Sequence, residues 1–227
     1  IPHWIETYDA STAEVWVKVP SIAAGTSTTL YLYYGGSICT TSWTADDVFI
    51  FFDDMGGLSG WTSIGTNSIG NTTYDGGTVI NKQNNNDPNG GWKSIGTTVD
   101  DYRLITREQR PNGTTGGGLN RYGVENSDFD GYNINRSATT TGSAAFGYER
   151  RDNSSAGNSN QVSLSQPRNN WYITELRRCS STNTNEAFLY ADDRTEIGGV
   201  TGSISAHNYA NFDRVTIRGG HVYYVDF

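Results

Sequence analysis

The chain has 227 residues, a mass of 24.8 kDa and a formal net charge of −8. A chain of this length buries roughly 70% of the surface that its unfolded form exposes, so it can form one substantial core without disulfides or metals. The acidic balance argues against nucleic acid or an anionic membrane as the partner. No apolar run exceeds the length of a strand, which excludes a membrane-spanning helix.

The N-terminal part of the chain alternates apolar and polar residues. This alternation, with many β-branched and aromatic side chains, predicts strands at residues 14–19 and 29–34. Because Pro20 and Gly25 lie between them, we expect these two strands to pair as a hairpin with a long loop. A third strand is expected at residues 48–52, after a turn-like segment.

The remainder of the chain has the same period of two. Further strands are predicted at residues 78–81, 92–95, 102–107, 118–122, 131–135, 144–149, 161–164, 171–178, 187–191, 203–207, 215–217 and 222–227. Long polar loops are expected at residues 81–91, 111–118 and 152–160. No window has the periodicity of an amphipathic helix, so helices should be single turns at most. Strands spaced about ten residues apart, with Gly, Asn and Asp turns between them, are typical of a sandwich or jelly roll. We therefore predict an all-β fold, a jelly-roll β-sandwich with a small N-terminal β layer.

Three ordered blocks near the N-terminus carry a family resemblance. They read Trp-Ile-Glu at residues 4–6, Val-Trp-Val-Lys-Val-Pro at residues 15–20 and Leu-Tyr-Leu-Tyr-Tyr-Gly at residues 30–35. Together they resemble the prokaryotic domain-of-unknown-function family 2341. That family usually has further strands before its first block, so the resemblance implies that this chain carries the C-terminal part of the domain.

A second resemblance begins after this part. Residues 51–62, with Phe-Phe-Asp-Asp-Met and later Gly-Trp-Thr, are similar to the opening of concanavalin A-like, laminin-G-type jelly rolls. Such domains often end on a strand like residues 223–227. We therefore expect a partial N-terminal β domain at residues 1–44 and a concanavalin A-like β-sandwich at residues 45–227. The two resemblances imply an extracellular or cell-surface protein and imply no particular activity.

Two kinds of modification, a disulfide and glycosylation, would be compatible with an exported protein. Cys39 and Cys179 have no neighbouring cysteine, which argues against a metal or redox motif. They either form one disulfide, worth about 4–5 kcal/mol in the chain-entropy model, or remain buried thiols. Asn-x-Ser/Thr sequons, which predict glycosylation in a secreted protein, occur about as often as the composition would produce by chance. They lie at Asn71, Asn112, Asn135 and Asn153.

A calcium site is one candidate for function. Asp53 and Asp54 follow the expected first strand of the sandwich, and Asp226 lies on the last. First and last strands are often neighbours in an antiparallel sandwich, so these carboxylates could supply the oxygen ligands that Ca²⁺ prefers. The alternative is that such Asp residues only cap strand ends and turns.

Sugar binding is the second candidate, because aromatic faces stack on pyranose rings. The aromatic residues expected to be exposed for this purpose are Trp61, Trp92, Tyr122, Tyr132 and Trp171, and the polar residues near them are Asn120, Arg121 and Asn133. The alternative is that alternating aromatics fill the core, as an aromatic content of 12% requires.

Catalysis has less support in the sequence. A glycosidase needs two carboxylates across a cleft, and Glu149 and Glu175 lie on strands that could face one sheet. The common hydrolase and nucleotide-binding motifs are absent from the sequence. We therefore predict that the chain is not an enzyme.

The first functional hypothesis is a non-catalytic extracellular protein that serves adhesion or glycan binding at a cell surface. The second is a structural subunit of a surface filament or coat, because both ends of the chain are strand-like and free sheet edges invite strand addition from a second copy. A polysaccharide-active enzyme is the third. The partners expected are thus a glycan or another cell-surface molecule, or further copies of the chain.

Overall fold

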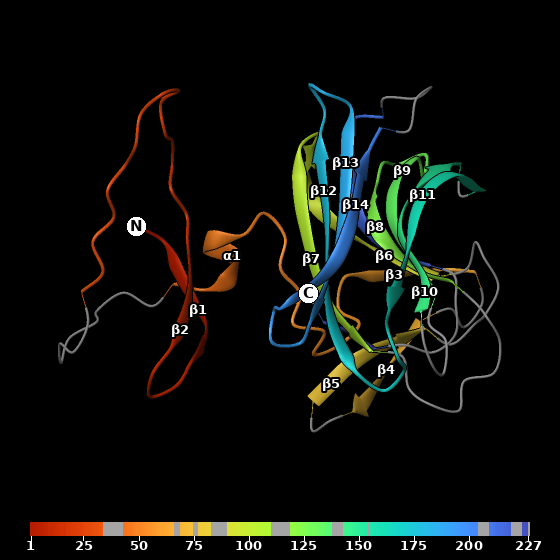
Figure 1. Ribbon diagram of the computed structural model, residues 1–227, viewed down its shortest axis with the longest axis horizontal. Helices are drawn as coiled ribbons and strands as arrows, with labels where there is room; N and C mark the ends of the chain where they lie inside the picture. Colours follow the sequence, from red (N-terminus) through yellow and green to blue (C-terminus); the bar gives the residue numbers. More distant parts are fainter. Residues whose placement is uncertain are drawn as a thin grey trace. The chain divides into compact units, whose positions relative to one another are not determined.

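The computed structural model describes residues 1–33, 43–65, 69–74, 77–82, 90–109, 119–137, 143–153, 155–203, 209–218 and 224–226 (Figure 1). The chain divides into two compact units, Ile1–Phe52 and Asp53–Phe227. The boundary between them comes eight residues after the one expected from the sequence.

The first unit is built on a two-stranded antiparallel sheet. Strands β1 (His3–Tyr8) and β2 (Ala13–Val17) pair so that Trp4 lies opposite Trp16. The single-turn helix α1 (Ala45–Val48) precedes Phe49, whose ring contacts both tryptophan rings, with centroid distances of 5.6 and 5.3 Å. Phe52 adds a contact to Trp4 at 5.0 Å. This aromatic cluster is the apolar centre of the unit.

The pairing of β1 with β2 corrects the expected hairpin. Residues 14–17 pair with the segment before them, and residues 29–33 are not in a strand. A short turn is the physical reason, because closing it costs less chain entropy than closing a longer loop. The carboxylate of Asp9 accepts hydrogen bonds from the backbone N–H groups of Ser11 and Thr12, which lower its pKa to about 2. The strand expected at residues 48–52 is also absent, since α1 ends at Val48 and the next four residues are not in a strand.

The second unit is a sandwich of two seven-stranded sheets that pack face to face (Figure 1). We call the first the β11–β3 sheet. Its strands, in spatial order, are β11 (Ser155–Ser165), β10 (Ser143–Asp152), β9 (Gly131–Ser137), β8 (Leu119–Glu125), β15 (Phe212–Arg218), β6 (Gly90–Val99) and β3 (Trp61–Ile64).

The second sheet is the β14–β4 sheet. Its strands, in spatial order, are β14 (Glu196–Gly202), β13 (Thr184–Ala191), β12 (Trp171–Cys179), β7 (Tyr102–Gln109), β16 (Tyr224–Asp226), β5 (Gly77–Lys82) and β4 (Ile69–Tyr74). All pairings between described strands are antiparallel. The predicted all-β sandwich is therefore confirmed.

Most of the predicted strands of the sandwich are present. The sequence missed β3, β4 and β14, whose glycines and polar residues weaken the alternation. The loop expected at residues 152–160 is instead the tight connection between β10 and β11, because residues 155–160 are part of β11. The loop at residues 111–118 and most of the strand expected at residues 203–207 lie outside the described residues.

The core between the sheets is mainly apolar, and it contains a buried pair of opposite charges. Its fully buried members include Tyr122 and Phe146 from one sheet and Leu176 from the other. Glu108 on β7 and Arg136 on β9 are both 0% exposed, and their charged atoms lie 2.8 Å apart. This pair joins the two sheets, and the Tyr122 hydroxyl donates a further hydrogen bond of 2.5 Å to Glu108. Removing one member would leave a buried charge, which is costly.

In the described part of the chain, no helix has the length and apolar character needed to cross a membrane.

Candidate functional site: the polar outer face of the β11–β3 sheet

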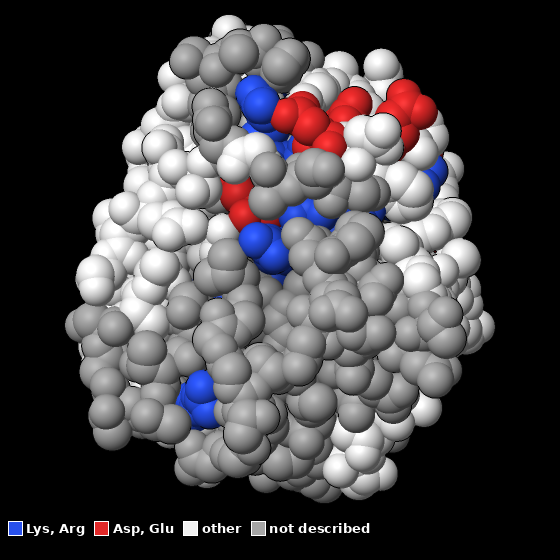
Figure 2. All heavy atoms as spheres, turned by 90° about the vertical axis from the view of Figure 1, so that its right-hand side faces the viewer, with Lys and Arg blue, Asp and Glu red and all other residues white. Residues whose placement is uncertain are grey.

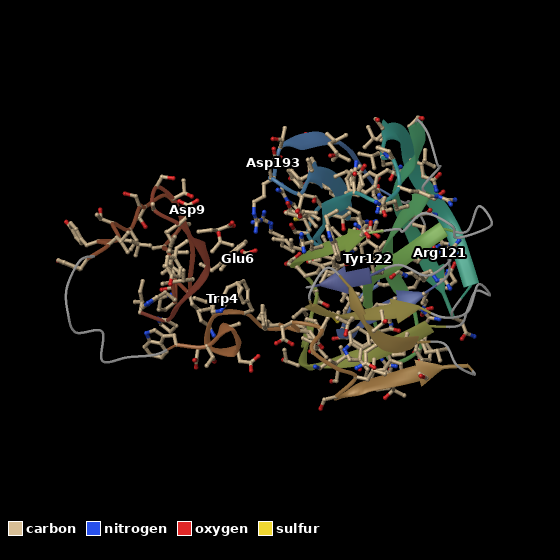
Figure 3. All side chains as sticks on the ribbon, turned by 90° about the horizontal axis from the view of Figure 1, so that it is seen from below. Trp4, Glu6, Asp9, Arg121, Tyr122 and Asp193 are labelled. Carbon is tan, nitrogen blue, oxygen red and sulfur yellow. The ribbon has the colours of Figure 1, made fainter. Side chains whose placement is uncertain are left out.

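Strand alternation gives the β11–β3 sheet two different faces. On β8, Tyr122 lies in the core between the sheets, and its neighbour Arg121 lies on the outer side (Figure 3). The register of β15, β8, β9 and β10 brings eight polar side chains to that outer side. We call them the polar face; they are Arg121, Glu125, Asn133, Asn135, Glu149, Arg151, Thr216 and Arg218. All eight are buried, although they lie on the side of the sheet that faces away from the second sheet.

Glu125 is the centre of the first hydrogen-bond group on this face. The guanidinium of Arg218 donates to both of its carboxylate oxygens, from Nε at 3.0 and 3.1 Å and from Nη2 at 2.7 Å. Asn133 donates from Nδ2 to Oε1 at 2.8 Å and accepts from the Thr216 hydroxyl at 3.2 Å. Glu125 and Arg218 are both 0% exposed, so this is a bidentate, fully buried ion pair of the strong kind.

Glycine makes room for this group. Gly123 lies between Arg121 and Glu125 on β8, and a Cβ atom there would clash with the side-chain oxygen of Asn133. The absence of a side chain at Gly123 therefore lets the Asn133 amide bridge Thr216 and Glu125.

Glu149 is the centre of the second group. Its carboxylate accepts from Asn135 Nδ2 at 2.6 Å and from Arg151 Nη1 at 3.1 Å, and Arg121 Nε lies 2.5 Å from Oε1. Burial raises the pKa of Glu149, and the two arginines and the Asn135 amide oppose that rise without cancelling it. A carboxyl group with a raised pKa and specific charged partners marks a candidate functional site.

Two aromatic rings and a fourth arginine form the rim of the polar face. Arg214 lies 4.4 Å from the ring centre of Trp92 and 5.0 Å from that of Phe129, which also lies 4.8 Å from Arg218. Trp92 and Phe129 are both half-buried. Phe129 has a φ of 63°, a conformation that bulky residues rarely adopt, in a turn held by the Asn126 side chain, which accepts from the N–H groups on either side of it. Such strain is often found at binding sites.

These groups have the chemistry of a polar binding site. Carboxylates, amides and guanidinium groups can fix the orientation of a ligand with many hydroxyl groups, and an aromatic ring offers its face to the ligand's apolar side. Figure 2 looks onto this side of the sandwich and shows basic and acidic side chains of described residues, most of them in the upper half of the view.

The structure separates the aromatic residues expected to bind sugar. Trp92 lies on the rim of the polar face, and Trp171 lies on the outer side of the other sheet, where Arg107 stacks on its ring at 4.2 Å. The expectation that Tyr122 and Tyr132 are exposed is wrong, because both are 0% exposed members of the core. Because side chains alternate along β8 and β9, both tyrosines lie on the side of the sheet that faces the second sheet.

Protein donors contact two of the three expected calcium ligands, Asp53 and Asp54, while the side chain of Asp226 lies outside what the structure describes, so the calcium site stays a prediction. Asp53 is buried and accepts from Met55 N, Trp61 Nε1 and Lys93 Nζ at 2.7 to 2.8 Å, so protein donors occupy it. Trp61 and Lys93 belong to the β11–β3 sheet, whereas Asp226 lies on β16 of the other sheet. Asp54 accepts from the N–H of Gly56. Among the described side chains, no group of three or more His, Cys, Asp or Glu could hold a metal ion.

The predicted modification sites differ in their surroundings. Asn71 and Asn153 are exposed and stay predictions, and Asn112 lies outside the described residues. The predicted glycosylation of Asn135 is wrong, because its side chain is buried and donates a hydrogen bond to Glu149, which leaves no room for a glycan. Cys179 carries an exposed, free thiol whose pKa is lowered by hydrogen bonds from Ser181 and Thr182. Cys39 lies outside the described residues, so the disulfide remains untested.

Glu149 and Glu175 do not share a sheet. Glu149 lies on β10 of the β11–β3 sheet and Glu175 on β12 of the β14–β4 sheet, so the idea that they form a catalytic pair is wrong. The sequence analysis named Arg121 and Asn133 as polar residues near the expected sugar-binding aromatics, but it missed Glu125 and Arg218, which also belong to the site. The sequence did contain a pattern that could have indicated these residues, because charged residues alternate with apolar ones on the predicted strands. The same pattern is also typical of an ordinary solvent-exposed face.

Comparisons with known proteins agree with this architecture. Residues 1–64 match the family model described as Domain of unknown function (DUF2341), a longer stretch than the three blocks that suggested it. An uncharacterised protein of Methanocaldococcus jannaschii is 32% identical over 177 residues, which is 75% of this chain. The chain spans only 17% of the length of that relative.

Two solved structures show the fold of the sandwich. The CBM2 module of an evolved Dit protein from Lactobacillus casei BL23 phage J-1 has a TM-score of 0.52 and 12% identity, and the match covers 77% of this chain and 91% of that one. A β-glucanase of Bacillus licheniformis has a TM-score of 0.50 and 10% identity, covering 78% and 94%. At these identities the likeness shows the fold alone, a β-sandwich of the kind found in that module and in that glucanase.

Proposed function

We propose that the chain is a glycan-binding protein and that its sandwich binds sugar at the polar face and its rim. The observation that carries the proposal is that one face of the sheet holds two buried, hydrogen-bonded carboxyl groups, Glu125 and Glu149, and has the half-buried ring of Trp92 at its rim. Buried charges destabilise a fold unless they are paired and satisfied, so a face that concentrates them is a candidate site. The likeness of the fold to a carbohydrate-binding module and to a glucanase supports the same proposal.

We place this activity outside the cell or at its surface, in adhesion or in retention of a polysaccharide. The support is the composition, which has only 18% charged residues. The exposed sequons Asn71 and Asn153 are compatible with export.

The test uses two matched tryptophans. Trp92 and Trp171 are both half-buried, lie on the outer sides of opposite sheets and each stack with one arginine. The full chain is screened on a glycan array, and the affinity of each hit is measured by calorimetry. We expect Trp92→Ala to weaken binding about tenfold or more and Trp171→Ala to leave it within about twofold. An array without hits, or equal losses in the two variants, would contradict the proposal.

Hydrolysis of a bound polysaccharide is the second candidate. It is favoured by one observation, the raised pKa of Glu149, since a glycosidase acid must hold its proton near neutral pH. Glu125 is a second buried carboxyl group on the same face, two strands away. A reducing-end assay on the polysaccharides that bind tests this candidate. Hydrolysis is supported if reducing ends are released and Glu149→Gln abolishes their release while binding persists. It is rejected if no reducing ends are released from any of these polysaccharides.

A feature of the first unit favours a third candidate function, the assembly of several copies of the chain through strand exchange. Leu30, Tyr31, Leu32 and Tyr33 are 49%, 78%, 76% and 90% exposed, and two-stranded sheets gain stability from a third strand. Light scattering coupled to size-exclusion chromatography tests this proposal. Oligomers that dissociate in the Tyr31→Lys, Tyr33→Lys double variant would support it, whereas a wild-type monomer at all concentrations would reject it.

A further inference from the structure

Two asparagines of the polar face, Asn133 and Asn135, differ in how their side chains are bonded. Both lie on the outer side of β9, two residues apart, and they are 0% and 2% exposed. The Asn133 amide uses both of its ends, because Nδ2 donates to Glu125 at 2.8 Å and Oδ1 accepts from the Thr216 hydroxyl at 3.2 Å. Both ends of the Asn133 amide therefore have a partner within the sheet.

The Asn135 amide uses one end only. Its Nδ2 donates to Oε2 of Glu149 at 2.6 Å. A carboxylate oxygen can only accept, so the N–H end of the amide faces Glu149 and the carbonyl oxygen, Oδ1, faces away from it. Oδ1 is buried and has no hydrogen-bond partner within the part of the chain that the structure describes. It is also a different atom from Nδ2, to which a covalent glycan would be attached.

The side chains opposite Asn135 do not supply the donor that Oδ1 lacks. On β10 its register partner is Gly147, which has no side chain and where a Cβ atom would collide with the backbone of β11. On β8 its partner is Arg121, whose Nε lies 2.5 Å from Glu149. A buried carbonyl oxygen without a donor costs free energy, and such a group in a folded protein calls for an explanation. The missing partner is a hydrogen-bond donor from outside the chain.

The chemistry of this donor follows from what each kind of ligand group offers. An ionised carboxylate or sulfate group has acceptors only, so it cannot bond Oδ1. An ammonium group can donate, but it would have to be buried as a charge, which costs far more free energy than burying a neutral group. A hydroxyl group donates one hydrogen and carries no charge. A sugar hydroxyl therefore fits Asn135 Oδ1 best.

The distance between Asn135 and Trp92 sets the length of the ligand. Asn135 lies on β9 and Trp92 on β6, and β8 and β15 lie between these two strands. Three strand spacings correspond to roughly 14 Å. A single sugar ring is too short to contact both residues, whereas an oligosaccharide that runs across the strands can reach both.

We infer that the ligand of the polar face is a neutral oligosaccharide, several sugar units long. A hydroxyl group of one unit donates to Asn135 Oδ1, while the ring of another unit lies against Trp92. This inference rests on the proposed function and narrows it to a substrate class. Asn135 then selects a free hydroxyl at one position of the sugar chain, because a ligand without that hydroxyl leaves Oδ1 buried and unpaired.

The first measurement uses the full wild-type chain and four neutral hexasaccharides: cellohexaose, mannohexaose, galactohexaose and xylohexaose. Calorimetry compares each of them with its monosaccharide and with derivatives that lack the hydroxyl at one ring position in turn. We expect the loss of one particular hydroxyl to weaken binding about 10- to 100-fold. The monosaccharide should bind at least about tenfold more weakly than the hexasaccharide, because it cannot contact Asn135 and Trp92 together.

A matched pair of variants then assigns the contact. In Asn135→Ala, the effect of removing that hydroxyl should shrink to within about twofold, because the acceptor is gone. Asn133→Ala, which changes the asparagine with both ends bonded, should keep the effect. A purely structural role of Asn135 would instead weaken all derivatives equally. Urea unfolding checks that both variants are folded, and the wild-type series decides alone if either is not.

Three results would overturn the inference. The first is equal affinity for every derivative of the hexasaccharides that bind, and the second is a hydroxyl whose effect survives in Asn135→Ala, since water would then serve Oδ1 in place of the sugar. The third is that none of the four hexasaccharides binds. If other glycans on the array still bind through Trp92 in any of these cases, the proposed function stands without this substrate class.

Discussion

The two outer sides of the sandwich carry the same three-residue charge cluster in different surroundings. On the polar face, Glu149 lies between Arg121 and Arg151, whose side chains are 11% and 0% exposed. On the opposite sheet, Glu175 lies between Arg103 and Arg177, whose side chains are 51% and 41% exposed. In both clusters the glutamate itself is buried.

This difference in exposure gives the two carboxyl groups opposite titration behaviour. For Glu149, burial raises the pKa more than its partners lower it. For Glu175, burial also raises the pKa, but the hydrogen bonds from Arg177 and Arg103 outweigh it and the pKa is lowered. The residue types alone therefore do not decide the pKa of the central glutamate, because the exposure of the two arginines to water affects it as well. The following predictions test this comparison.

The largest effect is expected where a fully buried pair is broken. Glu125→Ala leaves Arg218 buried without its carboxylate, so we expect the free energy of unfolding to fall by about 3–5 kcal/mol. The control, Asp192→Ala, breaks the pair with Arg107, which is 37% exposed, and should cost about 1 kcal/mol or less. Urea unfolding followed by fluorescence measures both. Equal losses would show that the two sides of the sandwich do not differ in solvation.

A smaller effect is expected for two tyrosine hydroxyls that donate to glutamates. Tyr122→Phe removes the 2.5 Å bond to Glu108 in the core and should cost about 1.5–3 kcal/mol, as hydrogen bonds to charged groups do. Tyr190→Phe removes the 3.2 Å bond to Glu175 on the outer side, where a half-buried hydroxyl should cost about 1 kcal/mol or less. The same unfolding experiment applies. An unchanged free energy of unfolding in Tyr122→Phe would contradict a stabilising hydrogen bond from Tyr122 to Glu108 in the core.

The pH dependence of stability should have opposite signs for the two glutamates. Glu149 has a raised pKa, so the folded state holds its proton more tightly, and the free energy of unfolding falls as pH rises from the ordinary value of 4.5 through the raised pKa. Glu175 has a lowered pKa, so stability falls as pH drops from 4.5 through that lowered value.

Each slope should disappear in the matching variant. Glu149→Gln flattens the curve above pH 4.5 and leaves the acid side unchanged, whereas Glu175→Gln does the reverse. Unfolding curves recorded at intervals of half a pH unit measure both. Identical pH profiles for the two variants would refute the opposite shifts.

The smallest effect is expected on the exposed cluster. Arg103→Ala should lower the free energy of unfolding by less than about 1 kcal/mol, and high salt should remove most of that loss. Arg121→Ala, its counterpart on the polar face, should cost more and respond less to salt, because its side chain is 11% exposed. Unfolding at low and high salt measures the difference.

Much of the second unit could be predicted from the residues alone. Alternation over residues 102–107 and 171–178 predicted strands that the structure contains as β7 and β12. The hairpin of the first unit could not be predicted in this way, because residues 14–17 have two neighbouring segments of strand-like sequence and only the geometry of the short turn selects β1. Of the site, the sequence indicated Trp92, Arg121 and Asn133 and, in part, Glu149.

The sequence by itself determined that this protein is an all-β sandwich, because a period of two is a local property of the chain. Only the tertiary structure decided which side of each strand faces the second sheet, and a shift of one residue reverses every side chain. That choice placed Tyr122 in the core and Arg121 on the polar face. The order of strands, which depends on long-range pairing, then separated Glu149 from Glu175 and brought Glu125 and Arg218 together.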